Sequence, residues 1–144
     1  MKKIKNLRLP NYNYASNGYY FITIATNYRH PYLNEYKELV SKNLKKLSCL
    51  QGVQIDYYEI MGNHLHSILI LEDSVLDLGE IVRRFKAITT REAGLKLWQP
   101  NYYEHVIRNK MALYRIREYI QNNPEIEKVD FEQFYNNKRN HKIT

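Results

Sequence analysis

The alternation of apolar and polar positions predicts three long strands in the first half of the chain. Residues 19–25 are rich in aromatic and β-branched side chains and follow Gly18, a combination typical of a strand. Residues 53–61 alternate with period two and predict a second strand. Gly62 and Asn63 then form a two-residue link, so we expect residues 64–71 to return as the antiparallel partner of a tight hairpin.

Three segments have helical periodicity instead. Residues 35–47 carry a stripe of Val40, Leu44 and Leu47. A second helix begins after Asp77, a good N-cap with Glu80 three residues later, and a third begins near Asn109 and ends before Pro124. The expected buried stripe of the second helix is Leu78, Ile81, Val82, Phe85 and Ile88, and that of the third is Leu113, Ile116 and Ile120.

A short strand is expected at residues 102–107, because Pro100 disfavours a helix there and the following residues are mostly β-formers. The element order is then β-α-β-β-α-β with an added C-terminal helix. This order predicts an α+β fold of the ferredoxin-like, split βαβ type, an antiparallel sheet with helices packed on one face. The length of 144 residues fits one domain, with a basic arm at residues 1–17 and a loosely packed tail at residues 125–144.

Composition narrows the class of partner. There are 22 Lys and Arg residues against 15 Asp and Glu, and the formal charge of +7 favours nucleic acid or an acidic membrane surface. The longest aliphatic run, residues 68–71, is far shorter than the ~20 residues of a membrane-spanning helix. The basic N-terminus lacks the apolar stretch of a signal peptide. The single cysteine, Cys49, fits a reduced cytoplasm, and we interpret it as a buried core residue.

Two histidines provide the first candidate chemistry. His64 and His66 are separated by one residue on a predicted strand, so both imidazoles point to the same face. Such a pair can hold a divalent cation with open positions for a substrate oxygen, or it can simply fill a polar gap at the sheet surface. On the third helix, Tyr119 and Asn123 lie four residues apart on one stripe. Asn123 could complete a metal site and Tyr119 could reach a bound phosphate, although a lone helical tyrosine is usually a packing residue.

Several separated motifs together resemble a known family. The chain from about Leu9 to Pro124 resembles the IS200-like single-tyrosine transposases of the HUH superfamily, in particular the branch of REP-associated tyrosine transposases. The motifs occur in the family's order: MGNHLHSILIL (61–71), RRFKAITTR (83–91), WQPNYYEHVIRN (98–109) and IREYIQNNP (116–124).

The resemblance implies a role for each matching residue. His64 and His66 match the paired metal-binding histidines, Tyr119 matches the nucleophile, and Asn123 matches the third ligand. The implied enzyme is a transposase or nickase that uses Mg²⁺ or Mn²⁺. It cleaves and rejoins single-stranded or hairpin DNA through a covalent 5′-phosphotyrosine.

Other candidate DNA-binding residues have competing interpretations. Trp98 and Tyr103 match a family signature and are either core residues or base-stacking surfaces, and His105 is either structural or close to phosphate. The basic side chains of the second helix could track a DNA backbone or form a solvated helix face; these are Arg83, Arg84, Lys86 and Arg91.

Two rival functions stay open. The same fold is also a platform for base stacking, so the chain could be a non-cleaving or domesticated nucleic-acid-binding module. A two-histidine phosphoesterase ranks lower, because the familiar variety needs a His-x-Ser/Thr pair on each of two strands and His64 and His66 form a single pair. The recognised DNA sequence, the identity of the metal, competence for transposition, and the choice between a monomer and a homodimer are not determined by the sequence.

Overall fold

The computed structural model describes residues 17–135, so most of the expected N-terminal arm and residues 136–144 lie outside the described part. Four strands form the sheet: β1 (Gly18–Ala25), β2 (Val53–Ile60), β3 (His64–Leu71) and β4 (Tyr103–Ile107). Three α-helices accompany them: α1 (Leu33–Lys46), α2 (Leu78–Ala93) and α3 (Lys110–Asn122). All seven predicted elements are present, with boundaries within a few residues of those expected.

The sheet is antiparallel with strand order β2-β3-β1-β4, the order of the predicted split βαβ fold. β1 and β3 are therefore the two inner strands. Their register sets Thr23 opposite His66 and Ala25 opposite His64. The turn between β2 and β3 closes with a hydrogen bond from the Met61 amide to the His64 carbonyl, 2.8 Å long.

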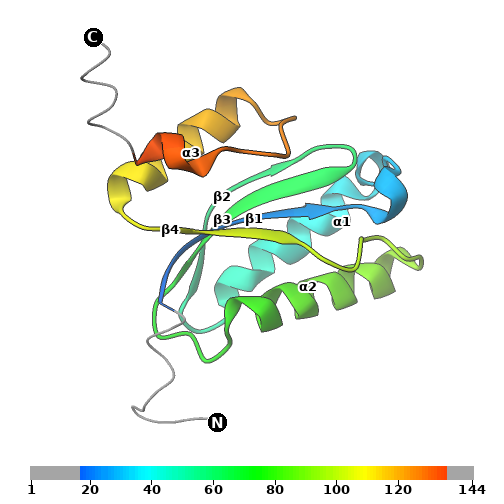
Figure 1. The fold of residues 1–144 in the computed structure, drawn as a ribbon. Coiled ribbons are helices and arrows are strands. Elements are labelled where there is room, and N and C mark those ends of the chain that lie inside the picture. The colour runs from blue at the N-terminus through cyan, green and yellow to red at the C-terminus, as the bar shows by residue number, and fades with distance from the viewer. Residues whose placement is uncertain (1–16, 136–144) are drawn as a thin grey trace.

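The helices divide between the two faces of the sheet (Figure 1). The crossover helices α1 and α2 cover one face, here called the helical face, whose core includes Ile22, Ile24, Leu69 and Phe85. α3 covers the opposite face and buries Phe21, Ile68, Leu113 and others in a second core. We call this the histidine face, because His64 and His66 alternate with Leu65 and so share the side of Ile68.

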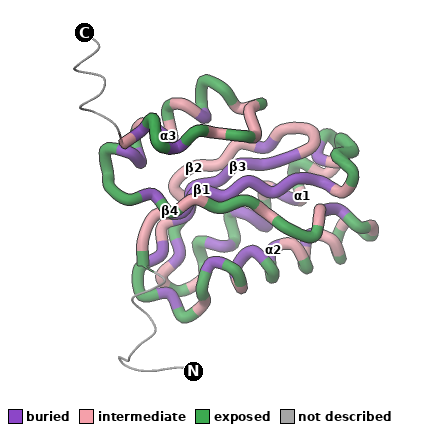
Figure 2. Tube along the Cα trace, viewed as in Figure 1, coloured by how far each residue is buried: buried purple, intermediate pink, exposed green. Residues whose placement is uncertain are grey.

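The inner strands carry most of the burial (Figure 2), because they are covered on both sides. α2 begins as predicted, with the Asp77 carboxylate accepting from the Glu80 amide at 2.9 Å. Its buried stripe differs at one position, since Thr89 is buried whereas Ile88 is only half-buried. None of the described helices is long and apolar enough to cross a membrane.

Three further expectations are corrected. Cys49 is exposed rather than in the core, because a short 3-10 turn at Leu47–Cys49 ends α1 and turns it outward. In β2, a bulge between Ile55 and Tyr57 breaks the predicted alternation and moves Tyr57 to the histidine face. The first part of the expected loose tail is packed, since Phe131 and Phe134 are buried in the second core.

Candidate active site

The histidine pair lies at the start of β3, beside the hairpin turn that precedes it. His64 is 3 % exposed and His66 is fully buried. The two rings meet edge to face with their centroids 4.8 Å apart. The alternation of the strand therefore brings both imidazoles to one place, as the sequence predicted.

Within residues 17–135, His66 has a hydrogen-bond partner at one ring nitrogen, Nδ1, and none at the other, Nε2. Its Nδ1 forms a 2.9 Å hydrogen bond with the Thr23 hydroxyl on β1, and its ring stacks on Phe21 at 5.4 Å. Among the described residues, its Nε2 is the one buried side-chain nitrogen or oxygen without a hydrogen-bond partner. Burial, assisted by the neighbouring His64, lowers the pKa of His66 to about 4. The ring is therefore neutral at pH 7 and has the form that binds metal ions.

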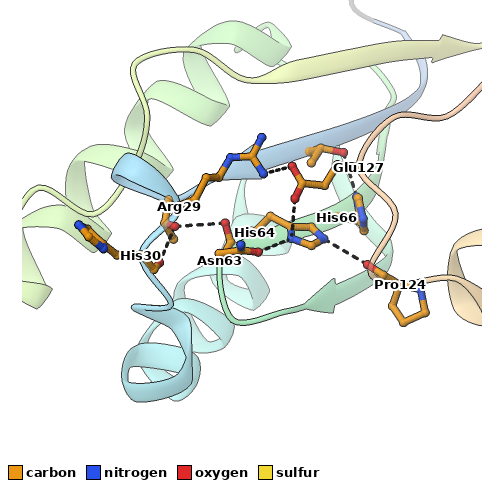
Figure 3. A network of polar contacts seen from close by, with 9 residues as sticks. Arg29, His30, Asn63, His64, His66, Pro124 and Glu127 are labelled. Carbon is orange, nitrogen blue, oxygen red and sulfur yellow. Dashed lines mark hydrogen bonds and ion pairs between the residues drawn. The ribbon is translucent and has the colours of Figure 1, made fainter.

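His64 is surrounded by oxygen atoms (Figure 3). Its Nδ1 lies 2.8 Å from the side-chain oxygen of Asn63, and its Nε2 lies 3.2 Å from the carbonyl oxygen of Pro124. The carboxylate of Glu127 is 3.6 Å from Nδ1. A metal ion bound at Nε2 of His64 thus competes with the Pro124 carbonyl.

The residues after α3 cover the histidine pair. We call residues 124–135 the C-terminal segment. Pro124 and Glu127 contact His64, and the Pro124 and Ile126 carbonyl groups favour the charged form of His66 without bonding its Nε2. Farther along, Phe131 stacks on His105 with ring centroids 4.1 Å apart. The sequence does not predict that the C-terminal segment covers the histidines, because the segment has no periodicity that indicates its packing.

Tyr119 and Asn123 make their contacts at the end of α3 and with the C-terminal segment. The Tyr119 ring packs edge to face on Phe134, with centroids 5.4 Å apart. The Asn123 side-chain amide donates to the Tyr119 carbonyl at 2.9 Å, and its backbone has left the helical region at the end of α3. In the described part of the chain, no hydrogen bond or ring contact joins either residue to the pair. The roles of Tyr119 and Asn123 therefore stay predictions.

The residues of the 98–105 signature take different positions. Trp98 is buried, and its indole donates to Thr89 at 2.8 Å, so the core interpretation holds for it and base stacking is not available. Tyr103 is about half exposed (48 %) on β4. His105 bonds the Tyr135 hydroxyl at 2.8 Å, and burial lowers its pKa. Its contacts fasten the C-terminal segment to β4.

The predicted basic residues lie on α2, on the opposite face of the sheet from the histidines. Glu80 binds both Arg83 and Arg84, and these two guanidinium groups hold its pKa at about 2. Arg91 is exposed. The Lys86 ammonium donates to the carbonyl oxygens of residues 99, 100 and 101 at 2.7, 3.1 and 3.4 Å, so it holds that loop.

Two cavities meet at the loop that Lys86 holds. The α2 groove, of about 420 Å³, is lined by Arg83, Lys86 and Lys96 and by Gln99 and Tyr102 of the loop. The β1 cavity, of about 400 Å³, is lined by Thr23, Arg29, Asn101 and Tyr103 as well as by the same Gln99 and Tyr102. The loop thus lies between the basic edge of α2 and the strand that supports His66.

The two histidines supply part, but not all, of a metal-binding site. The open Nε2 of neutral His66 and the adjacent His64 supply two nitrogen ligands. Among residues 17–135, no group of three His, Cys, Asp or Glu side chains converges to form a complete site. A third ligand would therefore come from another kind of group, such as an amide, a backbone carbonyl, a water molecule or a substrate oxygen.

Comparison with known proteins places the chain among transposases. A family model described as "Transposase IS200 like" matches residues 14–123. An uncharacterised protein of Haemophilus influenzae is 34 % identical over 157 residues, covering 83 % of this chain and 87 % of its own. The REP-associated tyrosine transposase of Escherichia coli K12 is 28 % identical over 113 residues, covering 77 % of this chain and 68 % of its own.

Two solved structures share the fold. One is a REP-associated tyrosine transposase bound to a REP hairpin, with a TM-score of 0.67 and 27 % identity, covering 76 % of this chain and 67 % of that chain. The other is a putative transposase of Deinococcus radiodurans, with a TM-score of 0.54 and 21 % identity, covering 72 % and 88 %. Since the family model spans well over half of the residues, the chain belongs to the IS200-like transposase family.

Proposed function

We propose that this transposase is a metal-dependent enzyme that nicks and rejoins single-stranded DNA through a covalent 5′-phosphotyrosine on Tyr119. The observation that carries the proposal is the histidine pair. The Nε2 of neutral His66 is buried without a partner among the described residues, on the sheet face that α3 covers. A similar transposase has been solved with a REP hairpin. We therefore propose hairpin DNA as the substrate.

The metal site would consist of His64 and His66, with the Asn123 amide oxygen as third ligand. A bound Mg²⁺ or Mn²⁺ would neutralise charge on the non-bridging phosphate oxygens. The Thr23 hydroxyl fixes the orientation of the His66 ring through Nδ1, which would leave Nε2 to bind the ion.

Tyr119 carries the group transfer. Its phenolic oxygen forms a bond to phosphorus, and the bond from phosphorus to the 3′-oxygen breaks. The phenol gives up its proton and the departing 3′-oxygen gains one, so the products are a phosphotyrosine ester and a free 3′-hydroxyl. The ester keeps the energy of the original bond, so attack by a second 3′-hydroxyl can reverse the step without ATP.

The end of α3 carries both remaining groups of this site. The Asn123 side-chain nitrogen donates to the Tyr119 carbonyl, and the Tyr119 ring packs on Phe134. The buried residues of α3 lie against β1 and β3 of the same chain, and only Arg108 and Asn109 separate this helix from β4. We therefore propose that Tyr119 acts on its own subunit, even if a homodimer forms.

The DNA path is proposed to run along the two cavities. Arg83, Arg84, Lys86 and Arg91 of α2 provide positive charge at the α2 groove and its surroundings, and the loop at Gln99 and Tyr102 leads to the β1 cavity. Phosphate contacts of this kind weaken steeply with salt. A hairpin along α2 could thus deliver its unpaired flank to the histidine face.

A non-cleaving nucleic-acid-binding module is the second candidate function. The observation that favours it is that the Tyr119 ring packs on Phe134 and, among the described residues, forms no hydrogen bond or ring contact with the histidines, a contact that a module that only binds does not need. Its DNA binding would be insensitive to EDTA.

The test uses hairpin-bearing single-stranded oligonucleotides with Mn²⁺, with protein-linked DNA measured on denaturing gels. Wild type should form an adduct, and Tyr119→Phe should form none while still binding DNA. The control is Tyr114→Phe on the same helix, which is half exposed and should react normally. A normal yield from Tyr119→Phe refutes the assignment, and cleavage without any adduct indicates a phosphoesterase.

The same assay tests action within one subunit. A mixture of His66→Ala and Tyr119→Phe proteins should stay inactive, because each chain lacks one half of its own site. Recovery of adduct in the mixture contradicts this part of the proposal.

A further inference from the structure

A strained corner follows β1 next to the histidine pair. Tyr28 and Arg29 both have positive φ, 53° and 60°, in a 3-10 turn at Asn27–Arg29. Residues other than glycine rarely adopt this region, because their Cβ comes too close to the backbone. Strain of this kind persists where the surroundings fix it, often at functional sites.

The corner is fastened to the turn that precedes the histidines. The Thr26 amide donates to the Asn63 carbonyl at 3.0 Å, and the Thr26 hydroxyl donates to the His30 carbonyl at 2.6 Å. Asn63 is the neighbour of His64 in sequence and lies 2.8 Å from its Nδ1. The corner and the metal-binding pair therefore hold a fixed relation.

This geometry aims Arg29 at the site (Figure 3). Its guanidinium pairs with one oxygen of Glu127, and the other oxygen of Glu127 lies 3.6 Å from His64 Nδ1. Arg29 also lines the β1 cavity, together with Thr23, the partner of His66. Arg29 is thus connected to His64 through Glu127 and lines, as Lys128 also does, a cavity of about 400 Å³, a size within the range of small-ligand pockets.

We propose that Arg29 is a phosphate-binding positioning residue. It binds the phosphate of a nucleotide seated in the β1 cavity, in exchange for Glu127. This assignment rests on the proposed function, where it holds the phosphodiester beside the histidine pair. Arginine presents a planar fork of donors that matches phosphate oxygens. The present partner is easily exchanged, because the Arg29 side chain is 48 % exposed and exposed ion pairs contribute little.

The remaining lining of the β1 cavity suits one nucleotide. Gln99 and Asn101 supply amide donors and acceptors, and the half-exposed ring of Tyr103 offers a stacking face. Unpaired bases are bound by this combination of polar groups and aromatic surface. The substrate class for the cavity is therefore a nucleotide of an unpaired strand with its phosphate on Arg29.

The test measures binding of thymidine 3′,5′-bisphosphate by the full chain in EDTA, with uncharged thymidine for comparison, by isothermal titration calorimetry. Wild type should bind the bisphosphate and not thymidine. Arg29→Gln should weaken binding about ten-fold or more, and Arg29→Lys less, because lysine keeps the charge but not the fork. Glu127→Gln should tighten binding several-fold, since it removes the competing carboxylate.

The matched control is Lys42→Gln on α1. Lys42 is exposed and ion-paired with Glu92 at 3.6 Å, so this change removes one charge and one ion pair on the helical face. Its bisphosphate affinity should stay within about two-fold of wild type. Thermal melting checks that every variant is folded. A tightening in Glu127→Gln is a gain that damage to the fold does not produce.

The outcomes separate this inference from the proposed function. No bisphosphate binding by wild type, or equal binding by wild type, Arg29→Gln and Glu127→Gln, overturns the role of Arg29 even if a Tyr119 adduct forms. Binding that depends on Arg29 in a protein that never forms an adduct supports the phosphate site and rejects the covalent chemistry.

Discussion

On the helical face, β1 and β3 place Ile22, Ile24 and Leu69 against α1 and α2, whereas on the other face the same two strands place Thr23, His64 and His66 beneath the C-terminal segment. Both sets are buried. The helical face gains stability from apolar contact. The histidine face buries a ring nitrogen without a partner, an arrangement that costs about 1–3 kcal/mol.

The two faces of this small sheet therefore carry different kinds of buried side chain. Successive side chains of a strand point to opposite faces. One strand can therefore carry the histidine pair on one face and core residues on the other. Changes in the apolar core of the helical face should therefore alter stability first. On the histidine face, which has an apolar core of its own, changes at the polar residues Thr23, His64 and His66 should alter metal and DNA chemistry first.

The largest expected effect on stability comes from Phe85→Ala on the helical face. Phe85 is 2 % exposed and packs against Trp98. Its truncation should lower the free energy of unfolding by about 3–5 kcal/mol, through lost burial and a cavity. Urea denaturation measures this, with Val75→Ala as an exposed control that should change it by less than about 0.5 kcal/mol. A loss below about 1 kcal/mol for Phe85→Ala contradicts the assignment of this face to stability.

A smaller and more selective effect is expected from Thr23→Val on the histidine face. The change keeps the shape but removes the hydroxyl that orients His66. Mn²⁺ affinity should fall about 10–100-fold. The free energy of unfolding should fall by about 1–3 kcal/mol, because the buried Nδ1 of His66 loses its hydrogen-bond partner.

Calorimetric titration with Mn²⁺ measures the affinity of Thr23→Val. The matched control is Ser41→Ala, which removes a 2.9 Å side-chain hydrogen bond to Tyr58 near the helical face. It should leave Mn²⁺ binding unchanged. Equal Mn²⁺ affinity in wild type and Thr23→Val counts against the metal role of His66.

The smallest effect is expected from Glu80→Gln on α2. The pKa of Glu80 is held at about 2 by Arg83 and Arg84, so its carboxylate stays charged and occupies both arginines at neutral pH. Neutralising it should tighten hairpin DNA binding at low salt and steepen the salt dependence by about one phosphate equivalent. Fluorescence anisotropy over a salt series measures the slope, with Glu92→Gln as control. An unchanged slope indicates that these arginines form a solvated face and do not contact DNA.

The sequence predicted the fold well, because its signals are local. Strand alternation, helical stripes, the Gly62-Asn63 turn and the Asp77 cap each act within a few residues. The errors arose where local order is interrupted, at the β2 bulge and at the turn that exposes Cys49.

The candidate site was predictable only in part. Because side chains alternate along a strand, the sequence alone predicts that His64 and His66 lie on the same face. The pairing of Thr23 with His66 depends on strand register, and the contacts of Arg29 and Glu127 join residues 98 positions apart. The sequence has two acidic residues shortly after Pro124, Glu125 and Glu127, and no local pattern distinguishes the one that reaches His64.

The two imidazoles belong to an inner strand that is hydrogen-bonded along both edges. Their spacing is thus dictated by the backbone ladder, and substitutions in distant loops leave it untouched. Loops at the edges of the sheet can therefore change in sequence while the two rings keep their spacing.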